Sequence, residues 1–320
     1  MEQTQTTSPH ELKSFITIAR EAYRLCKANI HALALLSAIP FVFVGGVQAI
    51  ASVVDTYQNS STTYLATFGI IALIFGVISF ILRVAYPLVI VRTIDSIHNA
   101  PSIQTSAGAT EGVDVSVMPA TIPAVDPHAL YMKSIKEFFP YFWVVLLSGC
   151  VLGASALFFV IPAFFVFAYF SFSTFTYLFE GKRGIQSLVA SAWIVRGRVY
   201  EALNRFLSVG ISLMFLGLIL SIVLHIITTI ALGSFDFNGV VADFILSLII
   251  TLFIMPYAYT CWYLLYRDFS VGVSAEIDPV FAKKAKYWAV FFSIIAGIAL
   301  IAIPTVLIAA IASGQIYFTF

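Results

Sequence analysis

The sequence predicts an all-α integral membrane protein, with about seven transmembrane helices and further amphipathic helices at the cytoplasmic interface. Two observations predict this fold class. Hydrophobic residues make up 60% of the 320 residues and charged residues only 10%. In a typical soluble domain, about half of the residues are hydrophobic and about a quarter are charged. The apolar residues also gather in runs of about 20 or more, the length that a helix needs to cross a bilayer. A soluble fold is therefore excluded.

Charge and cysteine content exclude other classes of protein and site. The net charge is +1, which argues against a nucleic-acid partner because such partners require a concentrated basic surface. The three cysteines, Cys26, Cys150 and Cys261, share no short spacing. Neither a disulfide framework nor a zinc site is expected.

Residues 1–28 are predicted to form a polar tail and an interfacial helix. Ser8-Pro9-His10-Glu11 has the pattern of a helix N-terminal capping box. One face of the following helix is apolar: Leu12, Phe15, Ile16, Ala19, Ala22, Tyr23 and Cys26. The opposite face is basic: Lys13, Arg20, Arg24 and Lys27. This pattern is typical of a helix at a membrane surface, and a helix packed on other cytoplasmic parts of the protein is the alternative.

A first transmembrane hairpin is predicted over residues 29–92. Its two apolar runs, 30–54 and 64–91, are separated by a polar turn that contains no Lys or Arg. Residues 93–127 are rich in Ser, Thr, Ala, Pro and Gly and show no periodicity. We therefore expect them to form a flexible cytoplasmic linker.

A second hairpin is predicted over residues 128–184, after a short amphipathic helix. The apolar run 141–179 is about twice as long as one span requires, and Pro162 divides it. We interpret it as two spans, with a re-entrant pair as the alternative.

Residues 185–268 are predicted to contain a short interfacial helix and a third hairpin, with spans over 206–232 and 240–265. Residues 269–320 then carry the basic cluster Lys283, Lys284 and Lys286 and a seventh span over 288–312. Each hairpin has a proline in or beside its second span: Pro87, Pro162 and Pro256. This suggests three pseudo-repeated helix-hairpin modules, although such patterns also arise by chance.

The distribution of positive charge predicts the orientation. Apart from Arg83, every Lys and Arg lies before the first span or between spans two and three, four and five, or six and seven. Under the positive-inside rule, the N-terminus is then cytoplasmic and the C-terminus lies outside. We expect a multi-pass protein of the cell (plasma) membrane.

The stretch from Phe175 to Leu207 is the most distinctive part of the chain. An aromatic helix ends at Glu180, a Gly-Lys-Arg-Gly turn follows, and the motif Ala190-Ser191-x-Trp193-x-Val195-Arg196-Gly197 precedes a new span. This pattern resembles the six-span integral membrane domain attached to some glycerophosphoryl diester phosphodiesterases, and related stand-alone uncharacterised bacterial membrane proteins. Where that domain is fused to an enzyme, catalysis belongs to a separate soluble barrel, so the resemblance implies a membrane domain without catalytic residues.

Five basic residues in or beside this stretch are candidates for contact with anionic lipid: Lys182, Arg183, Arg196, Arg198 and Arg205. Basic residues at a cytoplasmic interface attract anionic headgroups by about 1 kcal/mol each. The alternative is a structural clasp, in which Glu201 bridges Arg198 and Arg205 across one helical turn on either side.

Three residues form a candidate intramembrane polar site: Arg83, His225 and Asp243. A buried Arg83 is costly unless it is paired or faces water, and snorkelling of its side chain to the interface is the alternative. His225 and Asp243 fall near the outer ends of neighbouring spans, where they can form a proton relay, a structural pair or a solvated rim.

No catalytic motif is present, and the five histidines are scattered through different elements. We expect neither an enzyme nor a cofactor or metal site. The favoured function is a non-enzymatic protein that organises or maintains the bilayer through contacts with membrane lipids or a membrane protein partner. The alternatives are a small-molecule or lipid transporter with a midplane site near Arg83, and a regulatory subunit of a membrane complex.

Overall fold

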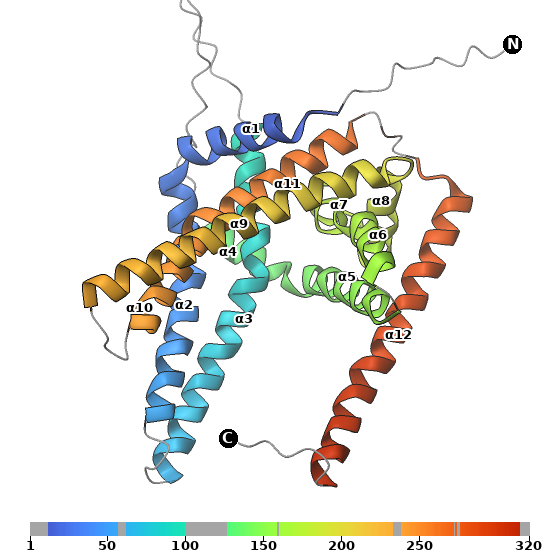
Figure 1. Ribbon diagram of the computed structural model, residues 1–320. Coiled ribbons are helices and arrows are strands. Elements are labelled where there is room, and N and C mark those ends of the chain that lie inside the picture. Colours follow the sequence, from blue (N-terminus) through green and yellow to red (C-terminus); the bar gives the residue numbers. More distant parts are fainter. Residues whose placement is uncertain are drawn as a thin grey trace, which may run out of the picture. The chain divides into compact units, whose positions relative to one another are not determined.

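A computed structural model describes residues 12–56, 62–99, 127–158, 160–232, 238–271, 273 and 276–313 (Figure 1). Within these residues the regular elements are all helices. In chain order they are α1 (Phe15–Ala28), α2 (Ile30–Thr56), α3 (Thr62–His98), α4 (Pro127–Lys136), α5 (Phe138–Phe158), α6 (Val160–Phe170), α7 (Ser173–Glu180), α8 (Ile185–Val195), α9 (Val199–Leu232), α10 (Asn238–Ile249), the π-helix η1 (Ile250–Ile254), α11 (Met255–Ser270) and α12 (Pro279–Ala312). The predicted capping box at Ser8–Glu11 and most of the predicted linker lie outside the described residues.

Five described segments are long and apolar enough to cross a membrane: Leu73–His98, Phe138–Ala156, Ala163–Glu180, Val199–Ala231 and Phe244–Ser270. A sixth is added if Phe15–Ala28 and Ile30–Phe43, which meet at 84°, form one broken span. The prediction of an all-α protein with several helices able to cross a membrane is therefore confirmed. Two of these segments, Phe138–Ala156 and Ala163–Glu180, together cover most of the apolar run 141–179, in agreement with its predicted division.

The chain divides into two compact units. Unit 1 contains Phe139–Leu207 and the chain from Tyr266 onward, and unit 2 contains Lys13–Phe138 and Ser208–Leu265. Because the boundaries fall inside α9 and α11, each of these helices contributes its two ends to different units.

In unit 2, α2 and α3 pack side by side as a hairpin, blue and cyan in Figure 1. In the C-terminal half of α3, residues 88–91 are all fully buried. Because consecutive helical residues point in different directions, this part of the helix is covered on all sides. The helix α3 continues to His98, so residues 93–98 belong to this helix and not, as predicted, to the flexible linker. Its polar last turns are stabilised by the protein, because Arg92 forms an ion pair with Glu137 and the Tyr263 hydroxyl donates a 2.6 Å hydrogen bond to Asp95.

Pro40 lies inside α2 and removes one backbone hydrogen bond from that helix. Because proline has no N–H, the carbonyl of Leu36 four residues earlier lacks its helical donor. The buried Tyr131 hydroxyl of α4 donates a 2.7 Å hydrogen bond to this carbonyl. The proline therefore creates the acceptor that attaches α4 to α2.

Pro256 has a similar effect after the π-helix η1. The Met255 N–H donates to the Ile250 carbonyl, five residues earlier, and the same register would pair Pro256 with Thr251. Proline cannot donate, and the Tyr86 hydroxyl lies 3.5 Å from the Thr251 carbonyl and 2.8 Å from Ser37 Oγ. Tyr86 of α3 thus reaches both α2 and η1.

In unit 1, α8 is a buried helix rather than the predicted surface helix. Except for Trp193, its residues from Ser187 to Val195 are buried, and it packs against α6, α7 and α12. The physical reason is that α8 contains no charged residue, and the hydroxyls of its buried serines, Ser187 and Ser191, bond within the protein. The charged residues that suggested a surface position lie in the joints on either side of it.

Those joints have the predicted form. Gly181 caps α7 in the left-handed conformation, with φ of 67°, and Gly197 has φ of 80° between α8 and α9. Backbone of this kind is favourable for glycine and strained for residues with a Cβ atom. The predicted sequence of helix, glycine turn, helix, glycine joint and helix is confirmed.

A break between α6 and α7, at Ser171 and Phe172, was not predicted. Ser191 of α8 bridges this break: the Phe172 N–H donates to Ser191 Oγ at 3.1 Å, and Ser191 Oγ donates to the Tyr169 carbonyl at 2.7 Å. One serine hydroxyl thereby satisfies a donor and an acceptor that the broken helix leaves without helical partners. Ser191 of the distinctive motif therefore has a structural role.

Candidate functional site

The helix α1 in unit 2 begins after Ser14, later than the predicted start, because residues 12–14 are not helical. It ends at a sharp turn. The Ser14 hydroxyl accepts a 3.3 Å hydrogen bond from the Thr17 N–H, which satisfies one free donor of the first turn. At the other end, the buried Asn29 side chain donates to the Leu25 carbonyl at 3.0 Å. The chain turns there by 84° into α2.

One face of α1 packs on the rest of unit 2. Ile18 and Ala22 are fully buried, Cys26 Sγ lies 3.3 Å from Thr260 Oγ1 of α11, and the Tyr257 hydroxyl donates to the Ala19 carbonyl at 3.4 Å. The predicted alternative of a helix packed on the protein therefore holds for this face.

Another face of α1 remains exposed and is both apolar and basic. Ile16 and Tyr23 are 66% and 57% exposed. Arg20, Arg24 and Lys27 are also exposed. Lys13 differs from them because it forms an exposed 2.9 Å ion pair with Glu21. Exposed apolar side chains beside unpaired cations are the surface that an interfacial helix presents to lipid.

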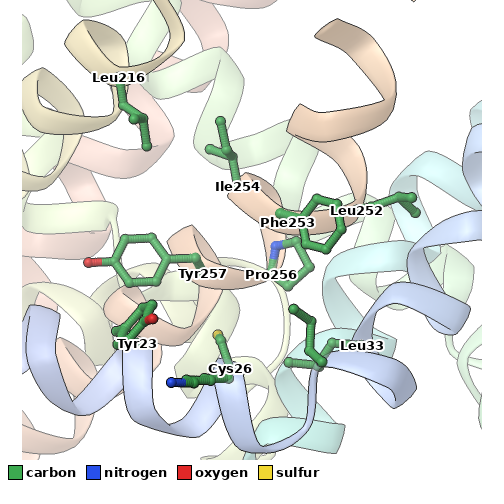
Figure 2. Close-up of a pocket in the computed structure, with 11 residues that line it drawn as sticks. Tyr23, Cys26, Leu33, Leu216, Leu252, Phe253, Ile254, Pro256 and Tyr257 are labelled. Atoms are coloured by element: carbon green, nitrogen blue, oxygen red, sulfur yellow. The ribbon is translucent and has the colours of Figure 1, made fainter. Parts of the chain in front are cut away.

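A groove of about 550 Å³ lies beside α1, and we call it the α1–α11 groove. Its lining residues come from α1, α2, α9, η1 and α11: Tyr23, Cys26, Lys27, Ile30, Leu33, Leu216, Leu252, Phe253, Ile254, Pro256 and Tyr257. Figure 2 shows Tyr23, Tyr257 and Leu216 on the left of this space, and Phe253, Pro256 and Leu33 on the right. The groove is concave and largely apolar, as small-molecule sites are.

The π-helix η1 contributes directly to this groove. Leu252, Phe253 and Ile254 all belong to η1, and Pro256 follows it. A π-turn contains an extra residue relative to an α-turn, which displaces the side chains around it, and such turns are frequent at functional sites. The lining therefore depends on the irregular backbone before Pro256.

Lys27 carries the only charge among the residues that line the α1–α11 groove. Its Nζ atom lies 6.0 Å from the Tyr23 ring centroid, and it forms no ion pair with another described residue. This arrangement can hold a hydrocarbon chain in the groove and an anionic group at Lys27. Lys27 was predicted to lie on a basic face, but the groove could not be predicted, because its lining residues come from helices that are distant in sequence.

Two of the predicted lipid-contact residues bind the protein instead. Arg205 forms a 2.8 Å ion pair with Asp268, and the side chains are 13% and 3% exposed. Arg198 donates a 2.8 Å hydrogen bond to the Phe269 carbonyl at the end of α11. Glu201 is exposed and bonds to neither arginine, so the prediction that Glu201 bridges Arg198 and Arg205 is wrong. The carboxylate comes from Asp268, which is buried beside Arg205.

Arg196 connects the end of α8 to the start of α12. Its guanidinium lies 4.9 Å from the ring centroids of Trp193 and Phe281, and 3.3 Å from Asp278. The Val280 N–H bonds to Asp278 and, together with Arg196, holds the pKa of that carboxyl below its ordinary value. Arg196 therefore has protein partners, although it is half exposed.

Lys182 and Arg183 lie in the turn between α7 and α8. Lys182 is partly buried and Arg183 is exposed, and neither side chain bonds to another described residue. Of the five predicted lipid contacts, these two remain available to an external anion.

The predicted intramembrane polar site is not assembled by the described residues. Arg83 is exposed on α3 and has no hydrogen bond or ion pair with another described residue. His225 is exposed on α9, and its Nδ1 lies 3.0 Å from the Ser221 carbonyl of the same helix. The Asp243 side chain lies outside the described part of the structure, so its predicted pairing with His225 stays a prediction.

No protein-family model, curated protein or solved structure matches this chain. The resemblance to the membrane domain of glycerophosphoryl diester phosphodiesterases therefore stays a prediction. Among the described residues, no three His, Cys, Asp or Glu side chains lie together in a way that could hold a metal ion. The α1–α11 groove is thus the candidate site with the clearest chemistry in unit 2.

Proposed function

We propose that this chain is a non-enzymatic, multi-pass membrane protein that organises the bilayer by binding anionic phospholipid in the α1–α11 groove. An acyl chain lies along the apolar walls, and the phosphate group pairs with Lys27. The observation that carries the proposal is the composition of the groove lining, which is apolar around a single unpaired ammonium group.

The charge on α1 supports an anionic rather than a neutral lipid. Arg20, Arg24 and Lys27 are exposed and form no ion pair with another described residue. Each basic residue near an anionic leaflet contributes about 1 kcal/mol of attraction. A zwitterionic lipid would gain less from these charges, because its headgroup carries no net charge.

The proposed topology has seven spans and places the protein in the cell membrane, with the N-terminus in the cytoplasm and the C-terminus outside. Its support is the alternation of Lys and Arg along the sequence. A reporter fused after Phe320 and another inserted at about residue 110 should report opposite sides of the membrane. Signals from the same side would contradict the seven-span count.

Thermal unfolding in detergent tests the proposed lipid site. Phosphatidylglycerol added to the purified full-length protein should raise the unfolding temperature more than phosphatidylcholine does, because a ligand that binds the native state stabilises it by mass action. Lys27→Gln should raise the phosphatidylglycerol concentration needed for this selective effect about fivefold, since one basic residue near anionic headgroups contributes about 1 kcal/mol of attraction.

The matched control is Lys13→Gln, which removes the same charge from a residue that is paired with Glu21 outside the groove. It should leave the selective effect of phosphatidylglycerol intact. If both variants lose the selective effect of phosphatidylglycerol equally, lipid binding depends only on the total charge of the protein, and the groove has no specific role.

The transporter and regulatory-subunit alternatives stay predictions. No observation favours a midplane site near Arg83, because that side chain is exposed and does not line the α1–α11 groove. A membrane protein partner is compatible with the exposed apolar helices, but these helices are equally suited to lipid.

A further inference from the structure

A second groove lies within unit 1, between α6 and α12, and we call it the α6–α12 groove. Its volume is about 570 Å³, and it is lined by Phe165, Val166, Tyr169, Phe170, Ala192, Phe281, Lys284, Ala285, Trp288 and Phe292. The lining positions on α6 and on α12 recur at spacings of three to four residues, so each helix turns one continuous face to the groove.

The walls of this groove are held in place by α8. This helix packs against both α6 and α12, and its Leu188 is clustered with Ala289 of α12 and Phe170 of α6. At the end of α8, the Arg196 guanidinium stacks on the Phe281 ring of the groove wall. The α6–α12 groove is therefore part of the packed structure of unit 1.

Lys284 carries the only charge among the residues that line the α6–α12 groove. It is exposed and forms no ion pair with another described residue. The Tyr169 hydroxyl and the Trp288 indole N–H also have no hydrogen-bond partner in the described part of the chain. One cation and two donors are thus available in an otherwise apolar groove.

These groups are arranged along α12 in the order that an amphiphile requires. Lys283, Lys284 and Lys286 lie near the start of the helix, and aromatic residues follow them. From Lys284 to Phe292 the helix rises about 12 Å. A headgroup without a phosphate would leave Lys284 unpaired, a zwitterionic headgroup would bring its own cation close to Lys284, and a small soluble anion would make no use of the apolar walls.

We propose that the α6–α12 groove binds one acyl chain of an anionic glycerophospholipid, whose phosphate pairs with Lys284. Tyr169 and Trp288 supply further donors to the headgroup and ester oxygens. This inference rests on the membrane placement proposed above but does not depend on the α1–α11 groove. It gives the protein two lipid sites, one in each unit.

Tryptophan fluorescence tests this inference, because Trp288 lines the groove and is 58% exposed. The full-length protein is reconstituted into phosphatidylcholine nanodiscs that contain a minor fraction of lipid with brominated acyl chains, which quench nearby indoles. The fluorescence of Trp288 is obtained by subtracting the fluorescence of Trp288→Phe from that of the native protein. Brominated phosphatidylglycerol should quench it at about fivefold lower mole fraction than brominated phosphatidylcholine, the ratio expected for one lysine near the headgroups.

Lys284→Gln should abolish this preference, whereas Lys286→Gln, the same change on the same helix outside the groove lining, should keep it. Ala285→Leu fills the groove beside an intact Lys284 and should reduce quenching of Trp288 by both lipids. Quenching of the other tryptophans, unchanged in each variant, serves as the control for folding.

Equal quenching by the two brominated lipids would overturn the proposed selection of an anionic headgroup. Absence of quenching at Trp288 by either lipid would overturn lipid occupancy and indicate that protein, such as a second copy of this chain, covers the groove. Lys27→Gln should not alter the Trp288 signal. If Lys27→Gln leaves the selective effect of phosphatidylglycerol on unfolding unchanged, while Trp288 is still quenched preferentially by brominated phosphatidylglycerol, the site in the α1–α11 groove is rejected and the site in the α6–α12 groove is kept.

Discussion

Replacing Asp268 by asparagine is expected to lower the free energy of unfolding by about 3–5 kcal/mol, because the change leaves the buried charge of Arg205 without its counter-ion. The Asp268 side chain is only 3% exposed and lies 2.8 Å from Arg205. This ion pair joins α9 to α11 within unit 1. Reversible unfolding of the purified protein in mixed detergent micelles measures the loss.

Glu201→Gln provides the matched control for Asp268→Asn. Glu201 lies one helical turn before Arg205 and is exposed, so its neutralisation should change the free energy of unfolding by less than about 0.5 kcal/mol. If Glu201→Gln were instead the more destabilising change, Glu201 would be the partner of Arg205, as local spacing alone suggests, and the ion pair between Arg205 and Asp268 would be contradicted.

Ser191→Ala is expected to destabilise the protein by about 2–4 kcal/mol. The serine hydroxyl bonds to both the Phe172 N–H and the Tyr169 carbonyl, and a buried backbone group that loses its partner costs about 1–3 kcal/mol. Phe172 is fully buried, so water cannot easily replace the lost bond. The same unfolding measurement applies, and hydrogen exchange at the Phe172 amide should accelerate.

Ser293→Ala is the control for this change. The Ser293 hydroxyl bonds only to the Ala289 carbonyl of its own helix, which retains its backbone donor after the substitution. If both variants unfold with the same free energy, the bridge from α8 to the break between α6 and α7 contributes nothing to stability.

The positions of the helices could be predicted from the sequence because they depend on local signals. Long apolar runs determined the helices able to cross a membrane, and Gly181 and Gly197 marked the joints around α8. The break at Ser171 and Phe172 could not be predicted in this way, because neither proline nor glycine occurs there. Its stability depends on Ser191, which is distant in sequence.

The partners of the charged residues could not be predicted, because they are separated by long stretches of chain. Arg205 and Asp268 are 63 residues apart, whereas the predicted partner, Glu201, is a neighbour of Arg205 on the same helix. The same limit applies to the candidate site. Ala19 and Tyr257, which connect α1 to α11 beside the groove, are 238 residues apart.

The burial of α8 shows a different limit. Short apolar helices flanked by basic residues occur both at membrane surfaces and in protein interiors, and only the presence of covering helices separates the two cases. Here α6, α7 and α12 cover it. A charged face would have indicated a surface position, and α8 has none, because it contains no charged residue.

Native mass spectrometry of the full-length protein, extracted gently from its own membrane, tests the proposed lipid site most directly. We expect the wild-type protein to retain an anionic phospholipid, Lys27→Gln to retain one bound lipid fewer, and Lys13→Gln to lose none. A protein that retains only neutral lipid, or that carries a stoichiometric protein partner or small molecule in place of lipid, would contradict this expectation.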